Sequence, residues 1–172
     1  MGSNPDLNDL KIRKARATDL TEILNIYNFY VEQGLATCDQ SKSTIESRRN
    51  WFRKFDSQHP LFVATLNQSV IAYCTLGPIS PKEGYSMSRE IGLYVDQNYQ
   101  SKGIGSKLLD HSLNAAKGLS IHHIQAKIFT VNEGSIRHFK RFGFQTVGTF
   151  HQIAHFQNQF YDVVILECLL NS

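Results

Sequence analysis

The chain has 172 residues, of which 41% are hydrophobic and 19% charged, and its formal net charge is +3. This length can bury a full core without disulfides or metals, and the ordinary composition excludes a disordered or fibrous protein. The small charge gives no reason to expect a nucleic-acid partner, and no apolar run approaches the roughly 20 residues that span a bilayer. We therefore expect one cytoplasmic domain over residues 11–170, behind a flexible leader at 1–10, with no membrane partner.

The cysteines and histidines do not have the spacing of a metal site. Cys38, Cys74 and Cys168 are odd in number and widely separated, which argues against a disulfide framework and against a zinc module. His151 and His155 share a strand face but lie about 13 Å apart by strand rise, too far to chelate one ion. We predict a protein without a metal.

In chain order, the first expected elements are a strand and a helix. Weak alternation of apolar residues predicts a strand over residues 11–16. Asp19 and Glu22 have the spacing of a capping box, apolar residues then recur at helical intervals, and Gly34 supplies the stop. A helix is therefore expected from Asp19 to Gly34, with a loop after it.

The next stretch predicts a second helix and a hairpin. Ser43 and Glu46 have the spacing of another capping box, and the helix that they begin carries aromatic residues as far as Phe55. Residues 61–66 and 70–76 are rich in apolar and β-branched residues and are separated by a short polar turn. These two segments are expected to pair as antiparallel strands.

The second half of the chain alternates strands and helices. Gly77-Pro78 should break the chain before a central strand at 88–95, and a short helix should begin at Asn132 and close at Gly143. The other elements are expected at 104–117 (helix), 121–130 (strand), and 145–155 and 160–169 (hairpin). The order β-α-α-β-β-β-α-β-α-β-β indicates an α/β fold with a mixed, mostly antiparallel sheet flanked by helices.

The central strand runs into a glycine loop that opens a helix. Gly103 and Gly105 fall at the helix N-terminus, where unpaired N–H groups and the helix dipole favour an anion and where glycine lets a phosphate come close. Leu108 stands where a dinucleotide fingerprint needs its third glycine, and the residues before Gly105-Ser106-Lys107 do not make a P-loop. The loop therefore predicts a phosphate-bearing cofactor that is not held by either of these motifs.

Two motifs resemble the signatures of a known family. Gln100-Ser-Lys-Gly103-Ile-Gly105 after Tyr94-Val95, and Asn132-x-x-Ser135 before Phe142-Gly143-Phe144, resemble those of the GCN5-related N-acetyltransferase (GNAT) family. The element order is also that of the family, so the resemblance covers residues 11–170. It implies that acetyl-CoA is the cofactor, bound by Leu93, Tyr94, Val95, Gln100, Ser101, Lys102, Gly103, Ile104, Gly105, Ser106, Asn132 and Ser135.

Within the family, the chain resembles the phosphinothricin and methionine sulfoximine acetyltransferases. Arg16-Ala-Thr18-Asp19 and the spacing from Tyr85 to Glu90 carry this resemblance. It implies transfer of an acetyl group to the primary amine of a small amino-acid-like acceptor. The residues expected to bind that acceptor are Phe29, Tyr30, Thr37, Tyr85 and Arg89.

The implied reaction needs a general base, because an alkyl ammonium has no lone pair at pH 7. Glu90 matches the glutamate that the relatives use, acting through a water. The other interpretation of Glu90 is a strand-end carboxylate paired to Arg89 or to a lysine. A backbone N–H of the central strand should stabilise the developing oxyanion, and Gly92 is suggestive because glycine in a strand often marks a bulge or a close approach.

Two positions depart from the relatives. Phe139 stands where they have a tyrosine or histidine that protonates the leaving thiolate, so the thiolate leaves unaided or is protonated by His138, by Tyr94 or by water. Ser86 stands where methionine sulfoximine acetyltransferases have an arginine suited to a substrate carboxylate. Phe139 keeps open a catalytically weak acetyl-CoA sensor, and acetylation of a protein or peptide is the other alternative.

The resemblance also implies a homodimer, commonly built through strands near the C-terminus. Phe156 and Phe160 would suit such an interface, since the hairpin that carries them is expected to present them to solvent. We predict a homodimer on this basis.

Overall fold

The computed structural model describes residues 7, 9–34 and 36–170, and within them seven strands form one sheet in the order β1-β2-β3-β4-β5-β7-β6. Only β4 and β5 run parallel among these pairs. The strands are β1 (Lys11–Lys14), β2 (Leu61–Leu66), β3 (Ser69–Pro78), β4 (Ser88–Val95), β5 (His123–Phe129), β6 (Gln145–Phe156) and β7 (Gln159–Leu169). The helices are α1 (Leu20–Gln33), α2 (Ile45–Phe52), α3 (Ile104–Gly118) and α4 (Glu133–Arg141). The predicted order of elements and the mixed, mostly antiparallel sheet are confirmed.

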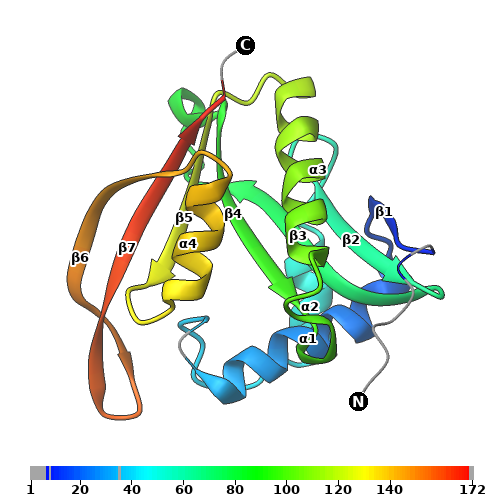
Figure 1. Ribbon diagram of the computed structural model, residues 1–172, viewed down its shortest axis with the longest axis horizontal. Helices are drawn as coiled ribbons and strands as arrows, with labels where there is room; N and C mark the ends of the chain where they lie inside the picture. Colours follow the sequence, from blue (N-terminus) through cyan, green and yellow to red (C-terminus); the bar gives the residue numbers. More distant parts are fainter. Residues whose placement is uncertain (1–6, 8, 35, 171–172) are drawn as a thin grey trace.

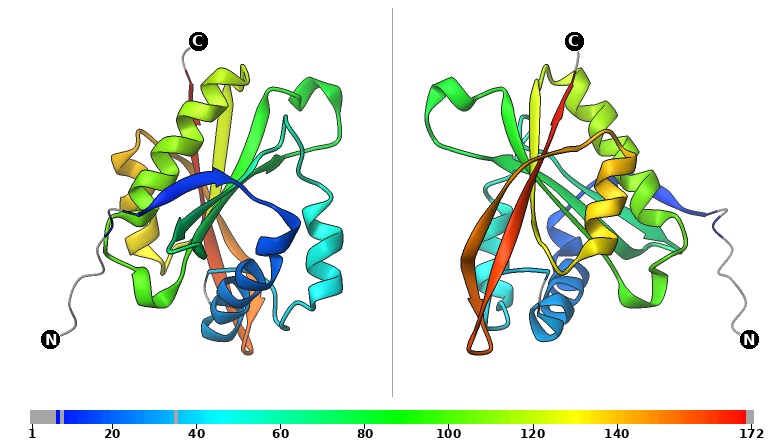
Figure 2. Two further views of the ribbon diagram at one scale, coloured as in Figure 1. Left: turned by 90° about the vertical axis from the view of Figure 1, so that its right-hand side faces the viewer. Right: turned by 60° about the vertical axis from the view of Figure 1, so that its left-hand side comes forward.

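Helices cover both faces of the sheet (Figures 1 and 2). α3 packs on β2, β3 and β4 from one side, whereas α1 packs on β3 and β4 from the other, with α2 packed against α1. Residues of β2 alternate between the two cores: Phe62 and Ala64 join the α3 side, and Leu61 and Val63 join the α1 side. The sheet is therefore the middle of three layers, which explains why β2 is buried along its whole length.

The central strands β4 and β5 part from each other within the sheet (Figure 1). They pair only where Ser88, Arg89 and Glu90 face residues 123–125. Beyond this point β4 continues along β3 as far as Val95, and β5 continues along β7. The facing edges of β4 and β5 then lack a neighbouring strand, and Glu90 stands where the separation begins.

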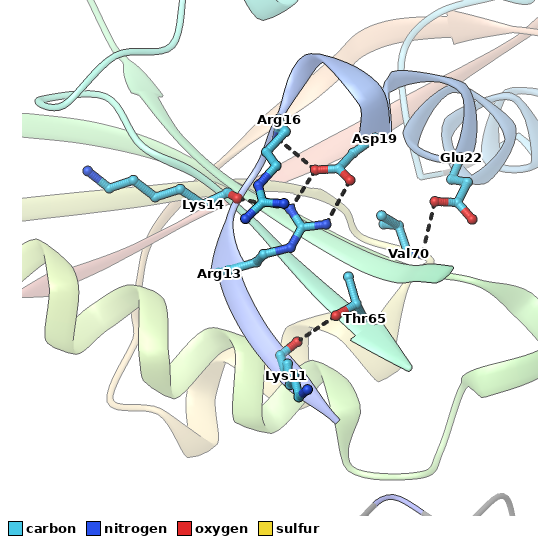
Figure 3. Close-up of polar contacts among 8 residues, drawn as sticks. All are labelled: Lys11, Arg13, Lys14, Arg16, Asp19, Glu22, Thr65 and Val70. Atoms are coloured by element: carbon cyan, nitrogen blue, oxygen red, sulfur yellow. Dashed lines mark hydrogen bonds and ion pairs between the residues drawn. The ribbon is translucent and has the colours of Figure 1, made fainter. Parts of the chain in front are cut away.

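An ion pair anchors the start of α1 to β1 (Figure 3). Asp19 is 5% exposed and accepts hydrogen bonds from both terminal nitrogens of Arg13, at 2.7 and 2.8 Å, and from the Arg16 amide at 2.6 Å. Glu22 accepts from the Val70 amide at 3.1 Å, which ties the helix to the β2–β3 hairpin. The predicted capping box between Asp19 and Glu22 is wrong, because Arg13 and the Arg16 amide bind the carboxylate of Asp19 and the Val70 amide binds that of Glu22.

The N-cap of the second helix lies one residue after the predicted N-cap, Ser43. Thr44 is the N-cap and accepts from the Ser47 amide at 3.1 Å. Ser43 instead exchanges two hydrogen bonds with the side chain of Asn28, at 2.8 and 3.0 Å, and so fastens the loop to α1. Phe55 lies beyond the end of α2, although its ring still packs on Trp51 with the centroids 4.7 Å apart.

Gly77-Pro78 does not break the chain where the sequence predicts. β3 continues through both residues, which pair with Glu90 and Arg89 of β4. The strand tolerates Pro78 because proline is its last residue, where a missing N–H removes no internal ladder hydrogen bond. Glu90 therefore has a complete strand beside it.

The β6–β7 hairpin packs against the end of α1. Gly34 stops the helix as predicted, with a φ of 68°, and a Cβ at this position would lie 2.3 Å from the ring of Phe156. Phe156 is 8% exposed, so the expectation that it faces solvent is wrong, whereas Phe160 is 64% exposed. Gln40 also donates to the His155 carbonyl at 3.0 Å and holds the hairpin to the loop after α1.

The start of the chain is only partly described. Leu7 and Leu10 pack against the main core and Asp9 lies in an exposed turn, whereas residues 1–6 and 8 of the predicted leader lie outside the described residues. Among the described residues, no helix is long and apolar enough to cross a membrane, and no group of His, Cys, Asp and Glu could hold a metal ion.

Replacing Asp19 should destabilise the fold in a pH-dependent way. Burial alone raises the pKa of Asp19, but hydrogen bonds from Arg13 and from the Arg16 amide outweigh it, so the pKa lies below its usual value. The ionised carboxylate therefore contributes stability above the unfolded pKa of about 3.9, and this contribution is lost as pH falls through the lower folded pKa. Asp19→Asn should lower the free energy of unfolding at pH 7 by about 1–3 kcal/mol.

Urea unfolding of both proteins from pH 7 to pH 3 measures this difference. The gap between wild type and Asp19→Asn should narrow in the acid, whereas Asp110→Asn, at an exposed position of α3, should match wild type throughout. A gap that stays constant down to pH 3 would contradict the role of the ionised Asp19.

Candidate active site

A cavity of about 810 Å³ lies where β4 and β5 separate. Its walls come from both sides of the sheet, because β4, β5 and the first turns of α4 meet residues of α1 and α2 there. Glu90, Asn132 and Ser135 line it, together with Tyr30 of α1 and Gln100 of the glycine loop. The hollow therefore joins the predicted base to predicted cofactor-binding positions.

The floor of the cavity is set by alternation along two paired strands. Glu90, Gly92 and Tyr94 share one face of β4, and Thr75 and Tyr73 of β3 lie beside the last two. A Cβ on Gly92 would lie 2.9 Å from Thr75 Oγ1, so glycine is required for this close approach. Gly92 has no side chain at the middle of this floor, the carboxylate of Glu90 lies at one end, and the stacked rings of Tyr73 and Tyr94 lie at the other.

Glu90 is held by two neighbours on β5. Its Oε2 accepts from Gln125 Nε2 at 3.0 Å and forms an ion pair with Lys127 Nζ at 2.7 Å. The side chains of Glu90 and Lys127 are 39% and 48% exposed, so water screens their attraction, and exposed pairs of this kind are worth at most about 1 kcal/mol. The lysine-paired interpretation thus describes Glu90 in this structure, and the weak pair leaves the carboxylate open to exchange partners.

Arg89 is not placed where it could bind a substrate. It is 3% exposed and donates to the carbonyls of Gln58, Ser86 and Ser88 at 3.0, 2.7 and 2.8 Å. Burial lowers the pKa of this guanidinium. The structure corrects the assignment of Arg89 to the acceptor, because alternation turns its side chain away from the face that carries Glu90.

Of the other predicted acceptor residues, Tyr30 alone lines the described cavity. Thr37 binds the Tyr27 hydroxyl at 2.8 Å, and Phe29 packs edge-on against Tyr30 with the ring centroids 5.4 Å apart. Tyr85 is 49% exposed and lies outside the cavity. The structure therefore brings Tyr30 to Glu90's cavity and leaves Phe29, Thr37 and Tyr85 behind or beside its walls.

The glycine loop has the conformation that an anion site needs. Gly103 is the N-cap of α3 with a φ of 78°, and Ile104 begins the helix with its side chain 1% exposed. Gln100 donates to Tyr30 Oη at 2.9 Å, and Lys102 Nζ donates to the Asn98 carbonyl at 2.8 Å. The loop is thus fixed by its side chains, and the backbone N–H groups at the start of α3 remain available.

The backbone of β4 beyond Glu90 presents alternate peptide groups to the separation. Asp96 donates its amide to the Ile71 carbonyl at 2.8 Å, so the amides of Gly92 and Tyr94 point toward β3 and those of Leu93 and Val95 point away. Gly92 N–H reaches Thr75 Oγ1 at 3.0 Å, and the β3–β4 register contains no bulge. The suggestion that Gly92 holds an oxyanion is therefore wrong, and the amide of Leu93 takes its place as candidate.

Asn132 and Ser135 form the cap of α4. Asn132 Oδ1 accepts from the Ser135 amide at 3.2 Å, which uses the oxygen of this side chain and leaves its NH₂ group free to donate. Both residues line the cavity. The motif thus has a structural role as a helix cap, and it also faces the space between the strands.

Three aromatic residues near the expected thiol end differ in whether they could protonate the leaving thiolate. Phe139 lines the cavity at 4% exposure and carries no proton. His138 lies outside the cavity, and its Nε2 is enclosed beside Gly105 with no hydrogen-bond partner among the described residues. Burial and, to a smaller extent, the charge of Arg141 lower the pKa of His138. Tyr94 lines the cavity, and its hydroxyl binds none of the described residues; burial raises its pKa, so it stays protonated.

Sequence reasoning missed the acceptor-side wall that α2 contributes. Arg48 is 4% exposed and its guanidinium carbon lies 3.9 Å from the Tyr27 ring centroid and 4.4 Å from that of Trp51. Lys54 and Asp39 also line the cavity. The signal was the three-residue spacing of Arg48 and Trp51, which places a charge on the inward face of an amphipathic helix.

Comparison with known proteins finds relatives that are similar over almost the whole chain. Residues 12–165 match the model of the family described as acetyltransferase (GNAT) domain. A phosphinothricin N-acetyltransferase of Streptomyces coelicolor is 32% identical over 167 residues, 95% of this chain and 98% of that protein. An L-methionine sulfoximine/L-methionine sulfone acetyltransferase of Pseudomonas aeruginosa is 29% identical over 162 residues, 93% and 94% of the two chains. The yncA protein of Salmonella typhimurium, solved with its cofactor acetyl-CoA, superposes with a TM-score of 0.89 at 26% identity, covering 95% of each chain.

Replacing Gly103 should weaken acetyl-CoA binding without removing the fold. A Cβ here would meet no atom within 4 Å, so Gly103→Ala acts only through the left-handed φ, which costs other residues about 1–2 kcal/mol. If the loop relaxes to avoid this strain, the acetyl-CoA dissociation constant should rise roughly 5- to 30-fold.

Isothermal titration with acetyl-CoA measures this change, and Gly84→Ala is the matched control. Gly84 also has open space around it but does not have a positive φ. Unchanged affinity in Gly103→Ala would show that the cofactor does not depend on this loop conformation.

Proposed function

The chain belongs to the GNAT acetyltransferase family, and we propose that it transfers the acetyl group of acetyl-CoA to the primary amine of a small amino-acid-like acceptor. The observation that carries this proposal is the place of Glu90. It lies at the point where β4 and β5 separate and lines a cavity that also reaches the glycine loop and the cap of α4. A base in this position can meet an amine from the α1–α2 side.

The residues of this chain fit an acetyl-CoA molecule laid between the strands. The N–H groups at the start of α3 would bind its pyrophosphate, the peptide groups of Leu93 and Val95 would pair with its pantetheine amides, and Asn132 would donate near its thiol end. Bound there, acetyl-CoA supplies an activated thioester. Lys102 and Gln100 support the loop through the bonds that they make to Asn98 and Tyr30.

The chemistry of the chain's own groups then follows from their positions. Glu90 accepts the proton of the ammonium, directly or through a water, while Lys127 and Gln125 keep the carboxylate facing the cavity. The Leu93 amide stabilises the negative charge on the carbonyl oxygen. Tyr94 is the candidate that returns a proton to the thiolate, since Phe139 has none and His138 lies outside the cavity.

The names of two relatives support an amino-acid-like acceptor. One acts on phosphinothricin and the other on methionine sulfoximine or sulfone, and each is similar to almost the whole of this chain. Acetylation of a protein or peptide and acetyl-CoA sensing are the alternatives. We further propose that the protein acts in the cytoplasm, as the sequence leads us to expect.

Glu90→Gln tests the proposed function directly. The change removes the base and keeps the shape, so turnover at pH 7 should fall about 100-fold or more while the acetyl-CoA dissociation constant stays within about twofold. The assay measures free thiol released from acetyl-CoA with phosphinothricin, methionine sulfoximine, methionine sulfone, free amino acids, polyamines and a lysine peptide.

Glu167→Gln is the matched control for this experiment. Glu167 faces Gln125 from the other side of β5 and is equally exposed at 39%, but it does not line the cavity. A Glu90→Gln protein that keeps most of its rate would remove Glu90 from the mechanism. Release with the lysine peptide alone would favour the protein-acetylating alternative, and binding without release would favour the sensor.

We also propose a homodimer formed through the C-terminal hairpin. Val147, Phe150, Ile153 and Phe160 of β6 and β7 are between 51% and 64% exposed, and large apolar side chains gathered on a strand pair favour a partner surface. Light scattering on the purified chain should give twice the monomer mass, and Phe150→Lys should reduce it. A monomer at micromolar concentration would contradict the dimer.

A further inference from the structure

Arg48 is a buried cation that the fold leaves without an anionic partner. It is 4% exposed, its Nε is fully enclosed, and its guanidinium makes no hydrogen bond or ion pair to the residues that the structure describes. The rings of Tyr27 and Trp51 flank it. Cation–π contacts offset part of the desolvation of the charge, but they supply no hydrogen-bond acceptor.

Tyr73 is a second unpartnered donor on the same wall. It is 1% exposed, and its hydroxyl is enclosed without a partner in the described part of the chain. Burial raises its pKa well above the usual value, so the hydroxyl keeps its proton and can donate. Its ring lies 6.2 Å from that of Trp51, between centroids, which places both donors around the same indole.

The other charges of this cavity are already engaged or exposed. Asp39 accepts from the Tyr27 hydroxyl at 2.5 Å and forms no ion pair with Arg48. Glu90 is paired with Lys127, and Lys54 lies on an exposed turn after α2. Two buried hydrogen-bond donors are costly to leave unsatisfied. Their arrangement therefore indicates that a bound ligand supplies the hydrogen-bond acceptor.

We propose that Arg48 and Tyr73 bind an anionic group of the acceptor, a carboxylate or a phosphinate, and so select acceptors that carry an anion. This inference rests on the proposed function and assigns specificity within the same cavity. Position 86 is a serine, and Arg89 is used up by hydrogen bonds to backbone carbonyls, so neither position offers a guanidinium to the substrate. On this proposal Arg48 of α2 provides the guanidinium instead of the loop before β4.

The position of the two donors also sets the direction of the acceptor. Arg48 lies at the tyrosine end of the cavity floor, because it stacks on Tyr27, whose ring contacts that of Tyr94 at 5.8 Å between centroids. Glu90 stands at the opposite end, four residues earlier on the same face of β4. The acceptor would therefore lie over Gly92 with its anion toward Arg48, and Glu90, about 13 Å along the strand by strand rise, would reach its amine through a water.

The single tryptophan of the chain makes this binding measurable without turnover. Trp51 touches the Arg48 guanidinium, so its fluorescence should report an anion that arrives there. Wild-type protein is titrated, without acetyl-CoA, with L-methionine sulfone, with its carboxamide and with L-phosphinothricin. The anionic ligands should change the emission in a saturable way, and the carboxamide should not. A response to phosphinothricin alone would identify the phosphinate as the bound group; equal responses to the sulfone and its carboxamide, with none to phosphinothricin, would overturn the proposal.

Variants separate this role from a structural one. Arg48→Gln should raise the KM of the anionic acceptors roughly 10- to 100-fold and abolish discrimination against the carboxamide, with the KM of acetyl-CoA unchanged. Arg48→Lys should retain part of the discrimination. Tyr73→Phe removes a hydroxyl that has no partner, so a purely structural residue would show equal or higher stability and an unchanged KM, whereas the proposal expects a KM several times higher.

Arg49→Gln is the control, because Arg49 is the exposed neighbour on the same helix. Arg48→Gln protein that unfolds as wild type does and yet keeps its discrimination would overturn the proposal. If Arg48→Gln does not fold, Tyr73→Phe and the wild-type titration decide. A wild-type protein that releases no thiol with any acceptor would defeat the proposed function instead, and Trp51 fluorescence would still decide whether an anion binds at Arg48.

Discussion

The separation of β4 from β5 is the constraint on which the rest of the molecule depends. Three residues of each strand pair, and beyond them the inner edge of β4 has no neighbouring strand in the part of the chain that the structure describes. Backbone N–H and C=O groups need partners wherever they are removed from bulk water. Tyr30 supplies one, by donating to the Val95 carbonyl at 2.6 Å, and the remaining groups open onto the cavity. The sheet thus creates a row of unpaired peptide groups that an extended ligand with its own amides can complete.

Helix α1 connects the two halves of the site. Tyr30 binds both Val95 and Gln100, so one hydroxyl joins the end of β4 to the glycine loop. One turn earlier, Tyr27 binds Thr37 and Asp39 and orders the loop that precedes α2. The helix is fixed at its start by the buried carboxylate of Asp19 and at its end by the contact between Gly34 and the β6–β7 hairpin. The glycine loop and the wall of the cavity that faces the acceptor are therefore coupled through α1.

The sequence predicts this fold well because its strands and helices follow local rules. Alternation and helical periodicity predict the seven strands and four α-helices but not the three short 3-10 helices, and Gly34 and Gly143 end helices where a positive φ is needed. The errors come from contacts that local rules do not contain. Asp19 has the spacing of a cap but binds Arg13, and Phe156 lies near a hairpin tip but packs on α1. Among the candidate site residues, backbone positions such as Leu93 and Gly103 follow from a motif, whereas Arg48 becomes visible only when α2 packs against α1 and brings it over Tyr27.

The two departures from the relatives have a common physical pattern. Phe139 packs edge-on against Phe144 at 5.0 Å between centroids, so this position belongs to the core and its replacement by a polar group would cost packing. The Ser86 carbonyl accepts a hydrogen bond from Arg89, so the loop before β4 has a structural role. On the assignments proposed above, the proton donor moves to Tyr94 and the anion-binding guanidinium to Arg48. Both lie on the α1–α2 side of the sheet, so a single aromatic layer would carry both polar groups, and the acceptor specificity of this chain would depend on how α2 packs.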